Sequence, residues 1–331
     1  MFTYEQKKFI KYVSEISLCG LVTLALYVFV IVFSVNTESY SAGLKQKFSL
    51  LTSTPSPRLV LVGGSSLAIG VNSNIIKSET NFNPINMGTF AALGIRFMFV
   101  SIDEYLQSGD TILFIPEHQV LQQPPYGSGH FLLETIHVNP YLISDVLTYH
   151  SLTTIVHHLP QWFQGRIKSI YARKIEPLFY ERELSLSDVL YNVYNFNSYG
   201  DVISESAGDQ HLTKKEVLES ESGYVGTGGI NSETIRFLSK RIEMLEQRGV
   251  HVLVSWPAMA QSIYDANPDL VKDRIDDLEN ALGQEHVIGS VEDFLVSDDV
   301  FVDASSHLTS TGRDEYTRRL ISLLIPYLQA Q

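Results

Sequence analysis

Two short polar stretches at opposite ends of the chain carry the residue types that nucleophilic catalysis requires. The first is Gly63-Gly64-Ser65-Ser66, directly after an apolar segment, and the second is Asp303-Ala304-Ser305-Ser306-His307, close to the C-terminus. Acyl transfer by a serine needs a histidine within hydrogen-bond reach of the hydroxyl and an acid that orients the ring. The two stretches together supply a nucleophile, a base and an acid, with Ser66, His307 and Asp303 as candidates.

Each stretch also has an ordinary structural explanation. A serine after a glycine turn often caps the N-terminus of a helix, and either Ser65 or Ser66 could take that position. The orienting acid is also open, because Asp298 and Asp299 lie in the same loop as Asp303. Residue types alone leave both serines and all three acids as candidates, and the surrounding elements must decide between them.

The apolar pattern predicts the elements that would position these side chains. Leu59 to Val62 form an uninterrupted apolar run that stops at two glycines. Such a run is typical of a strand buried in a parallel sheet, and a glycine after it permits a tight turn that lifts the next side chain above the sheet edge. Ligands of open α/β proteins bind at this edge, beside the carboxyl ends of the strands.

Strand and helix patterns alternate along most of the remaining chain. Strands are expected over residues 83–88, 110–115, 250–255 and 286–288, and helices over residues 94–106, 232–247, 269–282 and 309–328. This alternation predicts an α/β fold with a doubly wound parallel sheet, in which His307 lies just before the last helix. Residues 120–229 lack a clear period, and we interpret them as an insertion or lid over the sheet edge, or as a second domain.

A long uncharged segment precedes this region. The residues from Ile16 to Thr37 carry no formal charge and are mostly apolar. As a helix rising about 1.5 Å per residue, they would extend roughly 33 Å, which is enough to cross a bilayer. The sequence therefore predicts a transmembrane helix near the N-terminus.

The charges around this segment indicate its orientation. Lys7, Lys8 and Lys11 precede it, whereas Lys45 and Lys47 follow it, and positive residues favour the cytoplasmic side. The main domain is then expected in the periplasm or at the cell surface, held by a single-pass anchor, with a cleaved signal peptide as the alternative. The expected organisation is a cytoplasmic N-terminus over 1–15, a transmembrane signal anchor over 16–37, a linker over 38–57 and a catalytic domain over 58–331.

Composition excludes several classes of protein. The chain has 331 residues and a net charge of −13, which argues against nucleic acid as a partner, because phosphates are bound by clustered Lys and Arg. The single cysteine, Cys19, excludes an intrachain disulfide and a cysteine-based zinc site. We expect neither a metal nor a cofactor.

The serine stretch resembles the first signature block of the SGNH hydrolases, a superfamily of serine esterases and acyltransferases. That block reads Gly-Asp-Ser-Leu with a further glycine three residues later, and Gly64-Ser65-Ser66-Leu67 with Gly70 is similar to it. A serine replaces the usual aspartate. The resemblance implies that Ser66 is the nucleophile and that Ser65 is its neighbour at the site.

The histidine stretch resembles the last block of the same superfamily, in which an acid and a histidine are followed by a leucine and by a glycine that opens the terminal helix. His307-Leu308 and Gly312 are similar to that block, although three residues rather than two separate Asp303 from His307. The resemblance implies a flavodoxin-like, three-layer, doubly wound parallel sheet. It also implies an acyl-enzyme mechanism carried by Ser66, His307 and Asp303.

The resemblance further indicates which groups would hold the oxyanion. The strand end at Asn86, with Gly88 and Ala91 after it, is similar to the second block, whose backbone N–H binds the developing charge. The third block normally supplies an asparagine side chain, but here Glu117 and His118 follow the strand. An ionised glutamate only accepts hydrogen bonds, so His118 is the better donor candidate. Losing one oxyanion donor costs about 10²–10³ in rate.

The resemblance implies a membrane-anchored esterase or acyltransferase that acts outside the cytoplasm. Anchored relatives O-acetylate exopolysaccharide or assist D-alanyl transfer to teichoic acid. The expected substrate is therefore an acyl group, O-acetyl above all, on a cell-envelope glycan or exopolysaccharide, with a membrane-bound acyl donor as a partner. The missing asparagine and the altered acid spacing favour an alternative, a non-catalytic glycan-binding or assembly subunit of a polysaccharide export or modification complex.

Overall fold

The computed structural model describes residues 3–148, 150–180, 189–203, 211–220, 225–226 and 228–329. Within these residues the centre of the molecule is a parallel sheet of four strands in the order β2-β1-β3-β4. The strands are β1 (Arg58–Gly63), β2 (Asn83–Asn86), β3 (Thr111–Ile115) and β4 (His251–Val254), and a separate small sheet pairs β5 (Met259–Ala260) with β6 (Leu295–Val296). The chain is therefore an α/β protein with a parallel sheet, as the alternating pattern predicts.

The α-helices discussed below follow the sequence patterns with some changes at their ends. They are α1 (Tyr4–Phe33), α2 (Leu44–Ser53), α3 (Ser65–Gly70), α4 (Ser73–Glu79), α5 (Gly94–Val100), α6 (His118–Leu121), α7 (Gly129–Val138), α8 (Ile143–Leu147), α9 (Leu152–Ile170), α11 (Lys214–Glu219), α13 (Ser232–Glu246), α14 (Gln261–Ala266), α15 (Pro268–Leu282) and α16 (Ser310–Gln329). The helix expected over 94–106 divides into α5 and a short 3-10 turn. The strand expected over 286–288 is reduced to a parallel bridge between Val254 and Val287.

β1 lies at the centre of the sheet because its side chains are apolar on both faces. Leu59, Val60 and Leu61 are completely buried, as expected for a strand that helices cover on both sides. β1 pairs in parallel with β2 and with β3, and Gly63 lies opposite Ile115. The carboxyl ends of these three strands therefore reach the same edge of the sheet.

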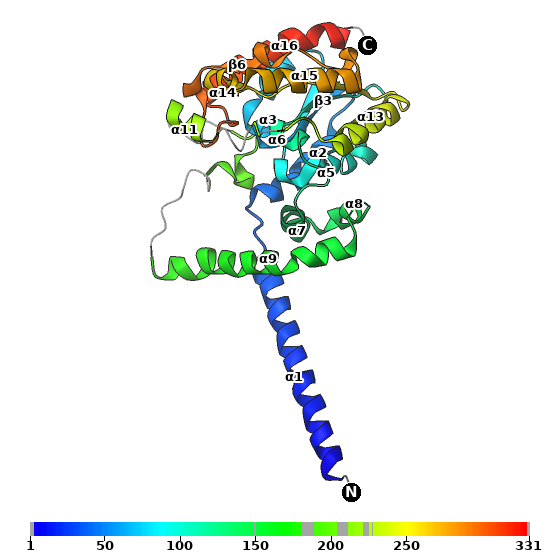
Figure 1. Cartoon of the computed structure of the whole chain (residues 1–331), viewed down its shortest axis with the longest axis vertical. Coiled ribbons are helices and arrows are strands. Elements are labelled where there is room, and N and C mark those ends of the chain that lie inside the picture. Colours follow the sequence, from blue (N-terminus) through cyan, green and yellow to red (C-terminus); the bar gives the residue numbers. More distant parts are fainter. Residues whose placement is uncertain are drawn as a thin grey trace.

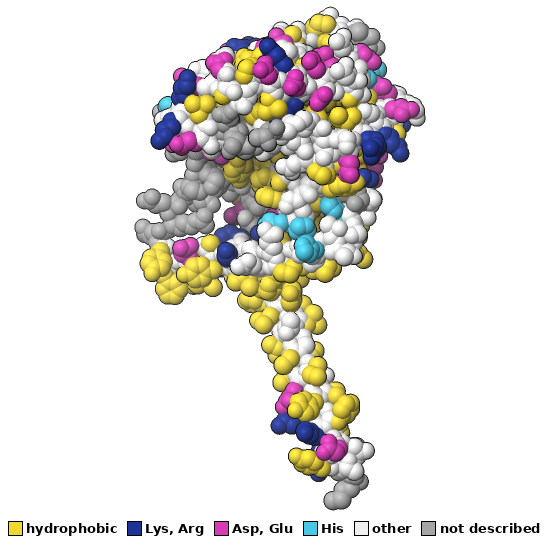
Figure 2. Space-filling model, viewed as in Figure 1, with side chains coloured by type: hydrophobic (Ala, Val, Ile, Leu, Met, Phe, Trp, Pro, Cys, Tyr) yellow, Lys and Arg dark blue, Asp and Glu magenta, His cyan; other side chains and the backbone are white. Residues whose placement is uncertain are grey.

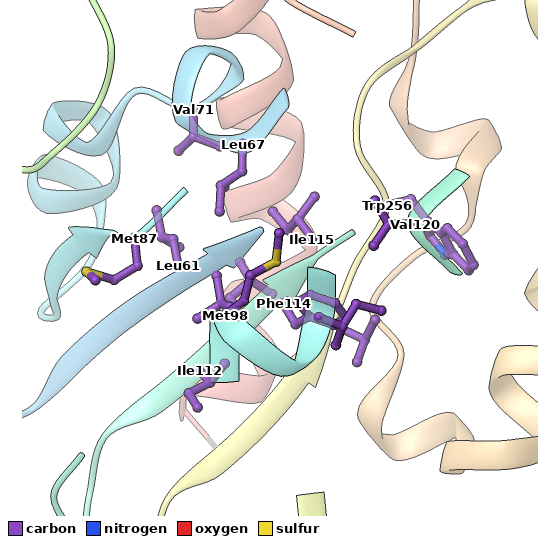
Figure 3. Packing of buried hydrophobic residues seen from close by; sticks show 14 of the residues in the cluster. Leu61, Leu67, Val71, Met87, Met98, Ile112, Phe114, Ile115, Val120 and Trp256 are labelled. Carbon is purple, nitrogen blue, oxygen red and sulfur yellow. The ribbon is translucent and has the colours of Figure 1, made fainter. Parts of the chain in front are cut away.

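Helices cover both faces of this sheet. Figure 1 shows α15 and α16 on the side of the sheet that faces away from α1. It shows α2 and α5 on the side that is nearer to α1. Figure 3 shows Leu67 of α3 and Met98 of α5 packed among strand side chains such as Leu61 and Ile115, all within one hydrophobic core. The strands are thus packed between two layers of helices.

α1 extends away from the rest of the molecule as a long apolar helix (Figure 1). Thr3 caps its N-terminus by accepting the Gln6 N–H, and the Gln6 side chain accepts the Thr3 N–H in return. Most of its apolar side chains are exposed, and Val30 is the buried residue near its end. The helix is long and apolar enough to cross a membrane, in agreement with the prediction from the uncharged segment.

The segment predicted as a linker packs onto the sheet instead. Within residues 38–57, α2 buries Leu44, Phe48 and Leu51 against the core, a spacing that places all three on one helix face. Two prolines near the end of this segment, Pro55 and Pro57, lie beyond the last residue of α2 and so do not interrupt the helix. The chain between α1 and β1 is therefore short and largely folded.

The segment interpreted as an insertion or lid, residues 120–229, contains α7, α8 and α9. Figure 1 shows these helices between the sheet and α1. Leu132, Ile136 and Trp162 belong to the same hydrophobic core as the strands, and Arg166 of α9 forms an ion pair with Glu134 of α7. The described part of this segment is thus packed against the sheet domain.

Candidate active site

Both candidate serines follow the central strand at the edge where the parallel strands end. Gly64 is the extended residue before α3, and Ser65 is the first residue of that helix. A Cβ atom at Gly64 would lie only 2.1 Å from Glu117 Oε1. The absence of a side chain at Gly64 leaves room for this carboxyl group, from the neighbouring strand end, to approach the turn.

His307 completes the site from the other end of the chain. Its Nε2 lies 2.9 Å from Ser65 Oγ, and its Nδ1 lies 2.7 Å from Asp303 Oδ1. When Nδ1 carries the proton and donates it to Asp303, Nε2 accepts the proton of the serine hydroxyl. Ser65, His307 and Asp303 form one continuous chain of hydrogen bonds across more than two hundred residues of sequence.

The structure places Ser65 rather than Ser66 against His307, which corrects the assignment made from the motif. Ser65 is half-buried, whereas Ser66 is 5% exposed and its N–H donates to Glu117 Oε1 at 3.1 Å. Successive residues of a helix point about 100° apart, so adjacent serines cannot face the same imidazole. The prediction counted the register from Gly70, but the start of α3 decides which hydroxyl faces the histidine.

Asp303 is the acid that orients the histidine, despite its unusual spacing. Burial acts to raise the pKa of Asp303, but the hydrogen bonds from His307 and Tyr191 outweigh it and hold that pKa below the usual value. The lowered pKa favours the charged carboxylate form of Asp303. The alternative acid Asp298 accepts hydrogen bonds from the N–H and hydroxyl of Ser262 instead.

Tyr191 is a site residue that the sequence reasoning missed. Its hydroxyl lies 3.2 Å from Asp303 Oδ2 and 3.1 Å from His307 Nδ1, and because Nδ1 already donates to the acid, the tyrosine hydroxyl donates to Asp303. Burial, followed by the charge of Asp303, raises the pKa of Tyr191 far above its ordinary value, so the group stays a donor. No motif marked it, since it belongs to the irregular middle of the chain.

Asn86 and Gly88, two of the predicted oxyanion groups, are occupied by other bonds. The Gly88 N–H donates to Asn86 Oδ1 at 2.9 Å, and the Asn86 amide donates to Asp201 Oδ1 at 2.8 Å. Ala91, the third group, begins a short 3-10 helix after the same strand end. Asn86 and Gly88 therefore brace the end of β2, and their polar groups do not stand free toward the serine.

Glu117 lies directly against the serine turn. It is 2% exposed, its Oε1 accepts the Ser66 N–H, and its Oε2 has no partner with hydrogen-bond geometry among the described residues. Burial raises the pKa of Glu117, and this effect exceeds the opposing contacts with Ser66 and the charge of His307. The environment favours the neutral acid, which carries an O–H donor that the carboxylate lacks.

His118, the donor that the sequence favoured, points into the core instead. Its ring is completely buried and stacks on Trp256, with ring centroids 5.6 Å apart. Burial, with a smaller contribution from Arg274, lowers the pKa of His118 to about 3, so the ring stays neutral. No hydrogen bond joins it to Ser65 or His307 in the described part of the chain, and the stacking explains its position after β3.

No protein-family model matches the chain, and no curated protein matches it either. Within the described residues, no group of three or more His, Cys, Asp or Glu side chains is arranged to hold a metal ion. The hydrogen-bonded arrangement of Ser65, His307 and Asp303 is suited to proton transfer and nucleophilic attack.

Proposed function

We propose that this protein is a membrane-anchored serine esterase or acyltransferase whose nucleophile is Ser65. The observation that carries the proposal is the hydrogen-bonded sequence from Ser65 through His307 to Asp303, with Tyr191 as a second donor to the acid. A serine, a histidine and a partly buried carboxylate connected in this order are the components of acyl transfer through a covalent intermediate.

In the proposed reaction His307 Nε2 takes the proton of Ser65 as Oγ bonds to the carbonyl carbon of an ester. The tetrahedral intermediate collapses, the ester C–O bond breaks, and His307 returns the proton to the leaving alcohol. Water or a sugar hydroxyl then gives its proton to His307 and attacks the acyl-enzyme. The new bond to the acyl group forms as the Ser65 bond breaks, and the proton passes back to Ser65.

The oxyanion would be held by a donor set that differs from the one implied by the motif. Asn86 and Gly88 are engaged with their neighbours, whereas the carboxyl group of Glu117 lies against the serine turn. In its neutral form Glu117 donates an O–H to an anion at that position. A carboxylic acid kept neutral by burial is a known solution for stabilising an oxyanion.

We further propose that the fold is the flavodoxin-like arrangement of the SGNH hydrolases. The strand order β2-β1-β3-β4 supports this, and the parallel bridge of Val287 to β4 adds the position of a fifth strand. It matches the first four strands of the flavodoxin-like order, in which the ligand site lies where the strand order reverses, between β1 and β3. Ser65 and Glu117 follow those two strands.

The proposed substrate is an ester on a cell-envelope glycan or exopolysaccharide, with O-acetyl as the acyl group. An anchor that keeps the domain beside the bilayer suits a polymer assembled there and an acyl donor supplied by a membrane-bound partner. Lys7, Lys8 and Lys11 at the start of α1 favour a cytoplasmic N-terminus. The domain would then lie in the periplasm or outside the cell.

The test is covalent labelling of the detergent-solubilised full chain with a fluorophosphonate. We expect Ser65→Ala to abolish labelling, and Ser66→Ala, the matched control in the same turn, to retain most of it. Mass spectrometry of the labelled peptide would locate the phosphonylated oxygen. Labelling of Ser66, or equal labelling of both variants, would contradict the assignment of Ser65.

A second candidate function is supported by the occupied donors at the end of β2. If Glu117 is ionised, the site lacks a side-chain oxyanion donor and would bind a glycan without cleaving an ester. The protein would then be an assembly or binding subunit of a polysaccharide export or modification complex. Absence of labelling in a wild-type chain that binds glycan would favour this function.

A further inference from the structure

α9 and the turns that follow it carry an apolar stripe that the sheet domain does not cover. Its large apolar members are 41–77% exposed. They are Leu152, Val156, Ile167, Tyr171, Ile175 and Leu178. Successive members are three or four residues apart, except for the step of 11 residues from Val156 to Ile167, which is three helical turns. This spacing keeps them on one side of a helix. A soluble surface rarely exposes an apolar patch of this length without a partner.

The other sides of α9 are accounted for. Trp162 and Arg166 are buried toward the domain, where Arg166 pairs with Glu134 of α7. Gln161 is exposed and, at five residues from Val156 and six from Ile167, lies on a different side of the helix from the stripe. The helix therefore has three sides with different surroundings, and the stripe is the apolar side that does not face the domain.

Contacts between α9 and α1 show where the stripe lies along the axis of α1. Phe163 of α9 packs on Tyr27 of α1 with ring centroids 4.3 Å apart. Arg173, just beyond α9, donates to the carbonyl of Ser34 at 2.7 Å. Figure 1 shows α9 lying across the end of α1, and Figure 2 shows hydrophobic side chains gathered on the side of α9 from which α1 extends.

The length of α1 places the stripe at the boundary of a membrane that α1 would span. About 18 helical residues separate Glu15, the last charged residue before the apolar run, from Phe33 at the end of α1. The corresponding rise of roughly 27 Å is close to the thickness of the hydrocarbon core of a bilayer. A helix lying across the end of such a span, with its apolar side toward it, occupies the interfacial region. Lys168 and Lys174 add cations that reach phosphate headgroups from this position.

We propose that α9 and the following turns to Leu178 form a lipid-binding surface that lies in the outer interface of the bilayer. This inference rests on the membrane anchoring proposed above but not on catalysis. The partner is lipid rather than another protein, because the stripe is continuous with the apolar surface of α1. Two contacts with the membrane, a span and a surface helix, would fix the tilt of the domain and the height of Ser65 above the lipid.

The experiment measures the depth of fluorescent labels in the full chain. The protein would be reconstituted in vesicles of phosphatidylcholine and phosphatidylglycerol that contain doxyl-labelled lipid. The native Cys19 reports the depth of α1. In a Cys19→Ser background, single cysteines at Val156 and Ile167 report the stripe, and one at Gln161 reports the polar side. We expect doxyl lipid to quench the stripe labels several-fold more strongly than the Gln161 label.

Each outcome separates the proposals. If the Cys19 label is not quenched by lipid, membrane anchoring itself fails. If Cys19 is quenched while the Val156 and Ile167 labels are quenched by aqueous iodide, the lipid-binding surface is overturned and the anchor stands. Stripe labels protected from both quenchers would show that protein covers the stripe, which also overturns the proposal. Circular dichroism of each labelled variant would confirm that the helices are retained.

Discussion

At the scale of single residues, the site is a set of polar groups whose protonation states are fixed by burial and partners. Asp303 is held charged by donors from His307 and Tyr191, although burial alone would favour its neutral form. Burial raises the pKa of Glu117 and favours its neutral form. Two carboxyl groups near one imidazole are thus biased toward opposite charge states, which is a common way to assign distinct roles to like residues.

The role of Asp303 predicts a graded loss of reactivity. Asp303→Asn should lower the rate of fluorophosphonate labelling by ~10³–10⁴, because the amide no longer holds His307 in the tautomer that accepts the Ser65 proton. Tyr191→Phe removes one donor to the charged acid, worth about 1.5–3 kcal/mol, and should cost about 10- to 100-fold. The readout is the second-order labelling rate. Loss as large for Tyr191→Phe as for Asp303→Asn would argue against a supporting role for the tyrosine.

The neutral state of Glu117 predicts a pH dependence. Because burial raises the pKa of this carboxyl, its O–H is present below that raised pKa and is lost as pH rises through it. Glu117→Gln keeps an N–H donor at every pH, so its labelling rate should not share the alkaline fall of the wild type. Glu117→Ala should lose about 10²–10³ in rate. A Glu117→Gln chain with an unchanged alkaline limb would contradict the proposal.

At the scale of elements, the site depends on where three strand ends and one loop meet. β1 delivers Ser65, β3 delivers Glu117, and the end of β2 is braced by Asn86 and Gly88. α2 supports this sheet from the segment between α1 and β1. Lys47 of α2 is buried and donates to the carbonyl of Asn86 at 2.8 Å, so α2 is tied to the strand end beside the site.

The docking of α2 predicts a loss of stability on truncation of its buried face. Leu51 is 1% exposed, and Leu51→Ala should lower the free energy of unfolding by about 2–5 kcal/mol. Lys45→Ala, on the exposed side of the same helix, should change it by less than about 0.5 kcal/mol. Denaturant unfolding of the full chain in detergent, followed by circular dichroism, measures both. Similar values for the two variants would mean that α2 is not docked.

At the scale of the whole molecule, the domain lies close to the C-terminal end of the long apolar helix α1. α9 lies across α1, and the sheet stands beyond α7 and α9 on the other side. The chain has no long flexible stretch between α1 and β1 in which the domain could move away from the membrane. If α1 spans a membrane as proposed, a site on this domain would be confined to substrates and donors near the bilayer.

The orientation of α1 predicts the result of a fusion experiment. Alkaline phosphatase fused after Gln331 should be active in cells, because that enzyme folds only outside the cytoplasm and Lys7, Lys8 and Lys11 favour an internal N-terminus. Replacing these three lysines by glutamate should lower phosphatase activity at equal expression. An inactive fusion with the native lysines would place the domain in the cytoplasm and contradict the proposed localisation.

The sequence by itself determined the elements whose signals are local. An apolar run ended by glycine predicts a buried strand and a turn, and the parallel arrangement then brings the strand ends together. The sequence therefore predicted the sheet, the membrane-length helix and the meeting of a serine turn with His307 and Asp303. Each depends on a short window of residues or on the geometry common to all parallel sheets.

Only the tertiary structure decided the features that depend on rotation and on distant contacts. The start of α3 turned Ser65, not Ser66, toward the imidazole, because adjacent helical residues point in different directions. Tyr191 donates a hydrogen bond to Asp303 from a segment that has no clear hydrophobic period. His118 lies outside the site because its ring stacks on Trp256. These choices follow from packing among residues far apart in the chain, which spacing and residue type do not encode.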